Sequence, residues 1–174
     1  MSLSSHPDCR ATIEDLDLPE RLHQHCKDAR IDPNRMMLEL TETSAMREAV
    51  QMMDVLTRLR LKGFKLSIDD FGTGYSSLVQ LQRMPFSEIK IDQSFVMQMT
   101  RDDSCRVIVE IVVELARRLR LRSVAEGVED EATLRALIDM GCDEAQGYHL
   151  SRPIAAAGMS LLLREHRGAG VVGK

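Results

Sequence analysis

The 174-residue sequence has no tryptophan, and aromatic residues make up only 3% of it. It therefore offers few rings on which single-stranded bases could stack, and a net charge of −4 gives no bulk attraction to nucleic acid. Its four cysteines form no Cys-x-x-Cys pair, so we expect reduced thiols. The longest apolar runs fall far short of the roughly 20 residues that span a bilayer. We expect a cytoplasmic protein without DNA or RNA partners and without a membrane segment in this chain.

The pattern of apolar residues predicts strands that alternate with helices. Predicted strands cover residues 36–41, 65–70, 88–92, 122–126 and 144–148, and predicted helices cover 17–29, 48–61, 76–84, 105–119, 131–140 and 154–164. Apolar residues at 44% and charged residues at 29% are ordinary for a globular domain. Such alternation predicts an α/β fold with parallel strands and helices covering the sheet.

Each predicted strand ends in a side chain that can bind a metal or a phosphate. These side chains are Glu39, Asp69, Asp70, Lys90, Asp92, Glu126 and Gln146. Adjacent carboxylates such as Asp69 and Asp70 repel each other unless a cation or a shared proton relieves the repulsion. A barrel of parallel strands would direct all of these ends to one mouth, where enzymes of this architecture build their active sites. The pattern indicates metal-dependent phosphate chemistry.

Five segments resemble the EAL-domain family, whose members hydrolyse the bacterial second messenger cyclic di-GMP. They are Leu38–Glu42, Asp69–Ser77, Ile89–Asp92, Ala125–Glu129 and Ala145–Tyr148, and the resemblance extends from about Leu16 to Leu163. The resemblance implies a TIM-type (β/α)₈ barrel, incomplete here at about five βα units, because such a barrel usually needs about 250 residues. It also implies a two-metal site for Mg²⁺ or Mn²⁺ and the linear product pGpG.

The resemblance further implies a role for each matching residue. Metal ligands would be Glu39, Asp69, Asp70 and Glu126, with Asp69 bridging both ions. Lys90 would hold the attacking water or a phosphate oxygen, Glu126 would act as ligand or base, and Gln146 would hydrogen-bond in the same mouth. Glu42 would anchor the loop that follows Asp70, and Asp92 would support the site. That loop, which would contact substrate or a dimer partner, comprises Phe71, Gly72, Thr73, Gly74, Tyr75, Ser76 and Ser77.

Two metal ligands of the family have no counterpart in this sequence. The Glu-Ala-Leu motif is absent, and Ser5-His6-Pro7-Asp8 stands where an asparagine ligand is expected. Residues 1–12 would be an irregular or non-native N-terminus, 13–166 a partial EAL domain and 167–174 a flexible tail. The chain is interpreted as a fragment of a longer protein, as a natural truncation, or as one of two copies that complete each other by swapping strands.

Three function classes remain open at this point. The first is the C-terminal part of a cyclic di-GMP phosphodiesterase, whose isolated chain we expect to be inactive because two ligands are missing. The second is a non-catalytic module that binds cyclic di-GMP or a protein. The third is another Mg²⁺-dependent barrel, of the enolase type, which the loop serines and tyrosine do not support. Expected partners are cyclic di-GMP, a second copy, or an upstream sensor or GGDEF-type domain.

Overall fold

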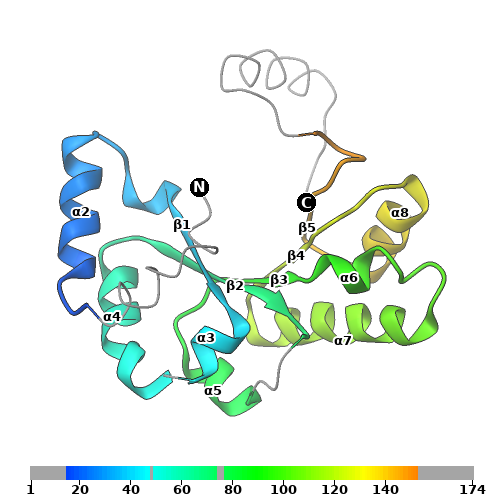
Figure 1. Cartoon of the computed structure of the whole chain (residues 1–174), viewed down its shortest axis with the longest axis horizontal. Helices are drawn as coiled ribbons and strands as arrows, with labels where there is room; N and C mark the ends of the chain where they lie inside the picture. The colour runs from blue at the N-terminus through cyan, green and yellow to red at the C-terminus, as the bar shows by residue number, and fades with distance from the viewer. Residues whose placement is uncertain (1–14, 48, 74–76, 153–174) are drawn as a thin grey trace.

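The computed structural model describes residues 15–47, 49–73 and 77–152. Its centre is one parallel sheet with the strand order β1-β2-β3-β4-β5 (Figure 1). The strands are β1 (Met37–Thr41), β2 (Lys65–Phe71), β3 (Glu88–Ile91), β4 (Arg122–Ala125) and β5 (Glu144–Ala145). Consecutive strands are neighbours throughout, and right-handed crossovers then place the connecting helices on one face of the sheet. This is the winding of a (β/α) barrel, with the first and last described strands not paired to each other.

Helices connect the strands and flank the sheet. They are α2 (Leu18–Asp28), α3 (Glu42–Arg47), α4 (Ala49–Leu61), α5 (Leu78–Arg83), α6 (Gln93–Val96), α7 (Asp103–Leu119) and α8 (Glu131–Met140), and a 3₁₀ turn, η1 (Pro33–Arg35), precedes β1. The long helix α7 packs on β3 and β4, and α2 packs on α4 (Figure 1). Within the described ranges, no helix has the length and apolar character needed to cross a lipid bilayer.

The two faces of the sheet carry different side chains because strand residues alternate sides. The face toward the helices holds buried apolar residues, among them Leu66, Ile68, Ile89, Ile91 and Ala125. Helix α7 meets it with Val109, Val112, Val113 and Ala116, which follow helical spacing and are all buried. This apolar layer is the core that fixes the register of the strands.

The opposite face of the sheet is largely polar, although Val124 of β4 also lies on it. The pairing places Ser67 beside Glu88 and Lys90 beside Val124, so alternate residues of neighbouring strands share this face. Near the amino ends, Arg122 Nη2 lies 2.7 Å from Glu88 Oε2, and Arg122 also pairs with Glu144. Near the carboxyl ends, the same face carries Glu39, Asp69, Lys90, Glu126 and Gln146. The face that lines a closed barrel thus carries two charged layers.

The predicted elements match the observed ones, apart from two short helices that were not predicted and one strand that ends earlier than predicted. Two short helices, α3 and α6, directly follow β1 and β3 and were not predicted. The strand predicted over 144–148 ends at Ala145, because the chain turns over Val128: the Val128 N–H donates to Gln146 O at 3.1 Å and the His149 N–H donates to Val128 O at 3.0 Å. A Cβ on Gly147 would lie 2.2 Å from Val128 O, so only glycine fits this turn. The helix predicted over 154–164 lies outside the described residues.

Candidate metal and phosphate site

The candidate site is centred on the ammonium of Lys90. Its Nζ lies 2.6 Å from Glu126 Oε1, 2.9 Å from Asp69 Oδ1 and 3.2 Å from Glu39 Oε1. These carboxylates come from β1, β2 and the end of β4, and Lys90 itself comes from β3, so four neighbouring strands meet here. The Lys90 side chain is only 9% exposed. The structure therefore brings together residues that are up to 87 positions apart in the sequence, as Glu39 and Glu126 are.

A β-bulge directs both adjacent acids into the site. The pairing of β2 with β3 shifts register between Ile68 and Phe71, and Asp70 lies in the left-handed region with φ +56°. In a regular strand, Asp69 and Asp70 would point to opposite faces, whereas a bulge re-aims the extra side chain. Oxygens of Asp69, Asp70 and Glu126 consequently lie within 4.8 Å of one another. Aspartate is one of the few residues that tolerate this backbone conformation.

Gln146 fixes the orientation of Glu126. Its Nε2 donates to Glu126 Oε1 at 2.5 Å, and the same oxygen receives the Lys90 ammonium. Gln146 is placed by its backbone N–H, which donates to Ala125 O at 2.9 Å just after β5. With Oε1 doubly engaged, Oε2 is the Glu126 oxygen left to face a ligand.

Burial and crowding shift the pKa values of the site. Burial lowers the pKa of Lys90, but the carboxylates of Glu126 and Asp69 more than offset it, so the net pKa is raised above its usual value. Burial, followed by the charges of Asp69, Asp92 and Glu126, raises the pKa of Asp70. Burial also raises the pKa of Glu126, against the lowering effect of Lys90. The pKa values of both partners of the Lys90–Glu126 pair are therefore raised, that of Lys90 by its carboxylate neighbours and that of Glu126 chiefly by burial.

Asp92 and Glu42 hold the segments around the site. Asp92 Oδ1 accepts a hydrogen bond from the Ser94 N–H at 2.8 Å and so caps α6. Glu42 Oε2 accepts one from the Gly72 N–H at 2.9 Å, directly after β2. Gly72 has φ +106°, and a Cβ there would lie 3.1 Å from Phe95 Cε2 in α6. The two short helices that were not predicted therefore brace the loop that follows the two aspartates.

The structure describes only part of this loop. Phe71 is buried at the end of β2, Thr73 Oγ1 donates to Asp70 O at 2.9 Å, and Ser77 is exposed before α5. Gly74, Tyr75 and Ser76 lie outside the described residues.

The donor set fits a hard divalent cation. Asp69, Asp70 and Glu126 offer carboxylate oxygens, which are the ligands that Mg²⁺ and Mn²⁺ prefer. Asp69 Oδ1 is buried, and the Lys90 ammonium lies 2.9 Å from it. No second group of three acidic, histidine or cysteine side chains with such spacing occurs among the described residues. Glu39 is not a member of this group of three carboxylates, but it is linked to the group because it pairs with Lys90.

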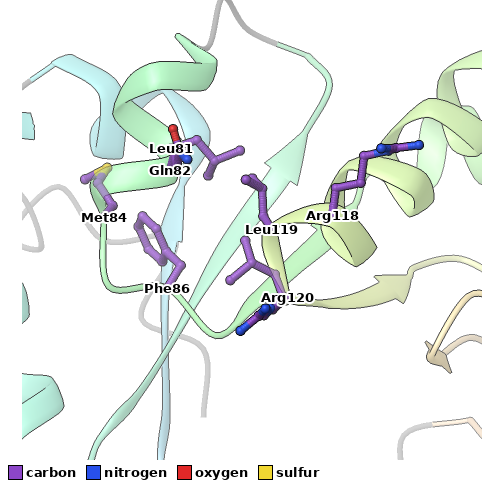
Figure 2. Close-up of a pocket in the computed structure, with 8 residues that line it drawn as sticks. Leu81, Gln82, Met84, Phe86, Arg118, Leu119 and Arg120 are labelled. Atoms are coloured by element: carbon purple, nitrogen blue, oxygen red, sulfur yellow. The ribbon is translucent and has the colours of Figure 1, made fainter.

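A separate hollow lies at the other end of the strands. It measures about 240 Å³ and lies between α5 and the C-terminal end of α7 (Figure 2). Leu81, Met84, Phe86 and Leu119 form its apolar lining, with Arg118 and Arg120 nearby. Because these segments lead into the amino ends of β3 and β4, the hollow is not part of the site around Lys90.

Comparison with known proteins defines the class. The EAL domain family matches residues 2–153. MucR of Pseudomonas aeruginosa, a bifunctional diguanylate cyclase/cyclic di-GMP phosphodiesterase, is 46% identical over 126 residues, which are 72% of this chain and 18% of MucR. The chain belongs to the EAL domain family, as its five sequence segments predicted.

Solved structures agree with this assignment. The MucR phosphodiesterase in complex with c-di-GMP superposes with a TM-score of 0.84 at 38% identity, over 90% of this chain and 62% of that one. A manganese and c-di-GMP complex of Klebsiella pneumoniae BlrP1 gives a TM-score of 0.75 at 34% identity, over 82% of this chain and 36% of that one. The prediction of an incomplete EAL-type barrel is confirmed by these likenesses and by the five-stranded parallel sheet. The chain spans about a fifth of the length of MucR.

Proposed function

We propose that this chain supplies the cation-binding and phosphate-binding part of a cyclic di-GMP phosphodiesterase domain. The observation that carries the proposal is the meeting of Glu39, Asp69 and Glu126 around the Lys90 ammonium at the carboxyl ends of four adjacent strands. Support comes from relatives that are named cyclic di-GMP phosphodiesterases and from the c-di-GMP complex of MucR. The partial domain is proposed to comprise residues 13–166.

Mg²⁺ or Mn²⁺ is the proposed cofactor. Asp69, Asp70 and Glu126 would hold one ion, and Glu39, with Asp69 shared, would serve the other. When bound, such ions neutralise the phosphodiester and lower the pKa of a bound water. A manganese complex of the relative BlrP1 supports this choice of cation.

The side chains of the chain have distinct proposed tasks. Lys90 places a buried positive charge where negative charge develops on a phosphate oxygen during attack. Gln146 keeps Glu126 Oε1 engaged, which leaves Oε2 to bind a cation or to accept a proton from the attacking water. Glu42 and Asp92 are proposed positioning residues: Glu42 holds the loop after β2, and Asp92 caps α6 and lies beside Asp70. Opening one ester bond of cyclic di-GMP by water gives pGpG.

A second function is favoured by a specific observation. Only one group of three ligand-spaced carboxylates is found among the described residues, and the sequence lacks the family's Glu-Ala-Leu and asparagine ligands. A chain with one cation site can bind cyclic di-GMP without cleaving it. In that case it acts as a binding module, in which Asp69, Lys90 and Gln146 retain the ligand.

Incubating the purified 174-residue chain with MnCl₂ and cyclic di-GMP tests both functions. We expect calorimetry to show binding and chromatography to show no measurable pGpG. Release of pGpG by this chain would contradict the expected inactivity. In a version that carries the missing ligands, Asp69→Asn should abolish hydrolysis because it removes the carboxylate shared by both ions. Retained turnover in that variant would refute the role of Asp69.

The wider assembly is also part of the proposal. The loop of Phe71–Ser77 would couple the site to a second copy of the domain, and a sensor or GGDEF-type domain would lie upstream. MucR is named as a bifunctional protein of this kind. Because a second messenger is degraded inside the cell, the proposal places the chain in the cytoplasm.

A further inference from the structure

Lys90 already neutralises the carboxylates that the proposed cation needs. In the described residues, every ion pair of Glu39, Asp69 and Glu126 is made with Lys90. The ammonium contacts Asp69 Oδ1 and Glu126 Oε1. Both residues belong to the group of Asp69, Asp70 and Glu126, whose carboxylate oxygens are spaced to bind a cation. A bound cation and the Lys90 ammonium would therefore compete for the carboxylates of Asp69 and Glu126.

We propose that Lys90 is an internal counter-ion that holds the site together without a divalent cation and opposes the binding of that cation. The inference rests on the cation site of the proposed function but goes beyond it. It assigns to Lys90 a role in the cation-free state, separate from any contact with water or phosphate.

Three features of the surroundings support this role. The four side chains are each at most 20% exposed, so water screens their charges poorly. Without Lys90, buried Asp69 and partly buried Glu39 and Glu126 would repel one another, and an unpaired buried charge is strongly destabilising. Gln146 Nε2 donates to Glu126 Oε1 at 2.5 Å, and this is the oxygen that contacts the ammonium, so the hydrogen bond favours the position of Glu126 beside Lys90.

The competition has a direct consequence for cation affinity. A bound cation must share its carboxylates with a positive charge that lies within 3 Å of two of them. Removing that charge should tighten cation binding even though it weakens the cation-free fold. A residue whose only task is to assist the bound cation would show the opposite effect on affinity.

Manganese titration of the full 174-residue chain, followed by electron paramagnetic resonance, tests the inference. We expect Lys90→Met and Lys90→Gln to bind Mn²⁺ about tenfold or more tightly than the wild-type chain. The matched control is Lys62→Met, which removes a lysine paired with Glu20 outside the site and should leave the affinity unchanged. Without MnCl₂ both Lys90 variants should have a lower Tm than wild type, and their Tm should rise more steeply with added MnCl₂.

Folding is monitored in the same samples by circular dichroism. A Lys90→Met chain that is unfolded alone but folds on addition of MnCl₂ supports the inference, since the cation then replaces the ammonium. Equal or weaker Mn²⁺ binding by both Lys90 variants overturns it, as does a chain that stays unfolded at every MnCl₂ concentration. Asp69→Asn is measured alongside: if it weakens Mn²⁺ binding, the cation site stands whatever the Lys90 variants show.

Discussion

The carboxylate of Glu42 accepts a hydrogen bond from the backbone N–H of Gly72, 2.9 Å away and thirty residues further along the chain. Glu42 is the first residue of α3 and is only 2% exposed. The contact ties the helix after β1 to the loop after β2, directly beside the two aspartates.

Glu42→Ala should lower the free energy of unfolding by about 1–3 kcal/mol, because the Gly72 N–H then loses a buried acceptor. Glu42→Gln keeps a carbonyl oxygen at the same place and should lose less. Urea denaturation of the three chains measures both differences. Equal losses for Ala and Gln would show that the hydrogen bond contributes nothing to stability.

Gly72→Ala should be more destabilising than Gly141→Ala. Both glycines have positive φ, at +106° and +79°, so alanine is strained at either position. A Cβ at Gly72 would also lie 3.1 Å from the Phe95 ring, whereas nothing lies within 4 Å of one at Gly141. We expect about 1–3 kcal/mol for Gly72→Ala from chemical denaturation. A larger loss for Gly141→Ala would contradict this account of the loop.

Glu88→Gln should change the pH dependence of stability. Burial raises the pKa of Glu88 above its ordinary value, even though Arg122 lies 2.7 Å away. The stability linked to this group is therefore present below its unfolded pKa and is lost as the pH rises through the folded pKa. Glutamine resembles the protonated acid, and Arg122 keeps its pairing with Glu144.

Thermal unfolding between pH 5 and pH 8 measures this effect. Relative to wild type, Glu88→Gln should be more stable at pH 8, and its advantage should shrink toward pH 5. An advantage that grows as the pH falls would mean that the charged form of Glu88 is the one favoured by the fold.

The sequence predicted the strands because buried parallel strands with polar ends leave a clear pattern. Leu66-Ser67-Ile68-Asp69 alternates between the apolar and polar faces, and the helix predicted over 131–140 coincides with α8. The convergence of Glu39, Asp69, Lys90 and Glu126 followed from the rule that carboxyl ends of parallel strands share one edge.

Features set by tertiary contacts were not predictable in the same way. The bulge at Asp70 depends on how β2 pairs with β3, and the only signal in the sequence was the doubled aspartate. Helix α6 has a cap, Asp92 with Ser94, but its four residues are too few for a periodic pattern. The strand predicted to reach Tyr148 stops early because Gly147 packs on the backbone of Val128, a contact between distant segments.

Binding of Mn²⁺ to the wild-type chain and to Asp69→Asn tests the central claim most directly. Asp69 shares with Asp70 and Glu126 a group of carboxylate oxygens within 4.8 Å of one another, and its Oδ1 is buried beside the Lys90 ammonium. The account predicts that Asp69→Asn weakens Mn²⁺ binding at least about tenfold, whereas Asp103→Asn, an exposed aspartate in the first turn of α7, leaves it unchanged. Equal Mn²⁺ affinity in the wild-type and Asp69→Asn chains would contradict a cation site built by these strands.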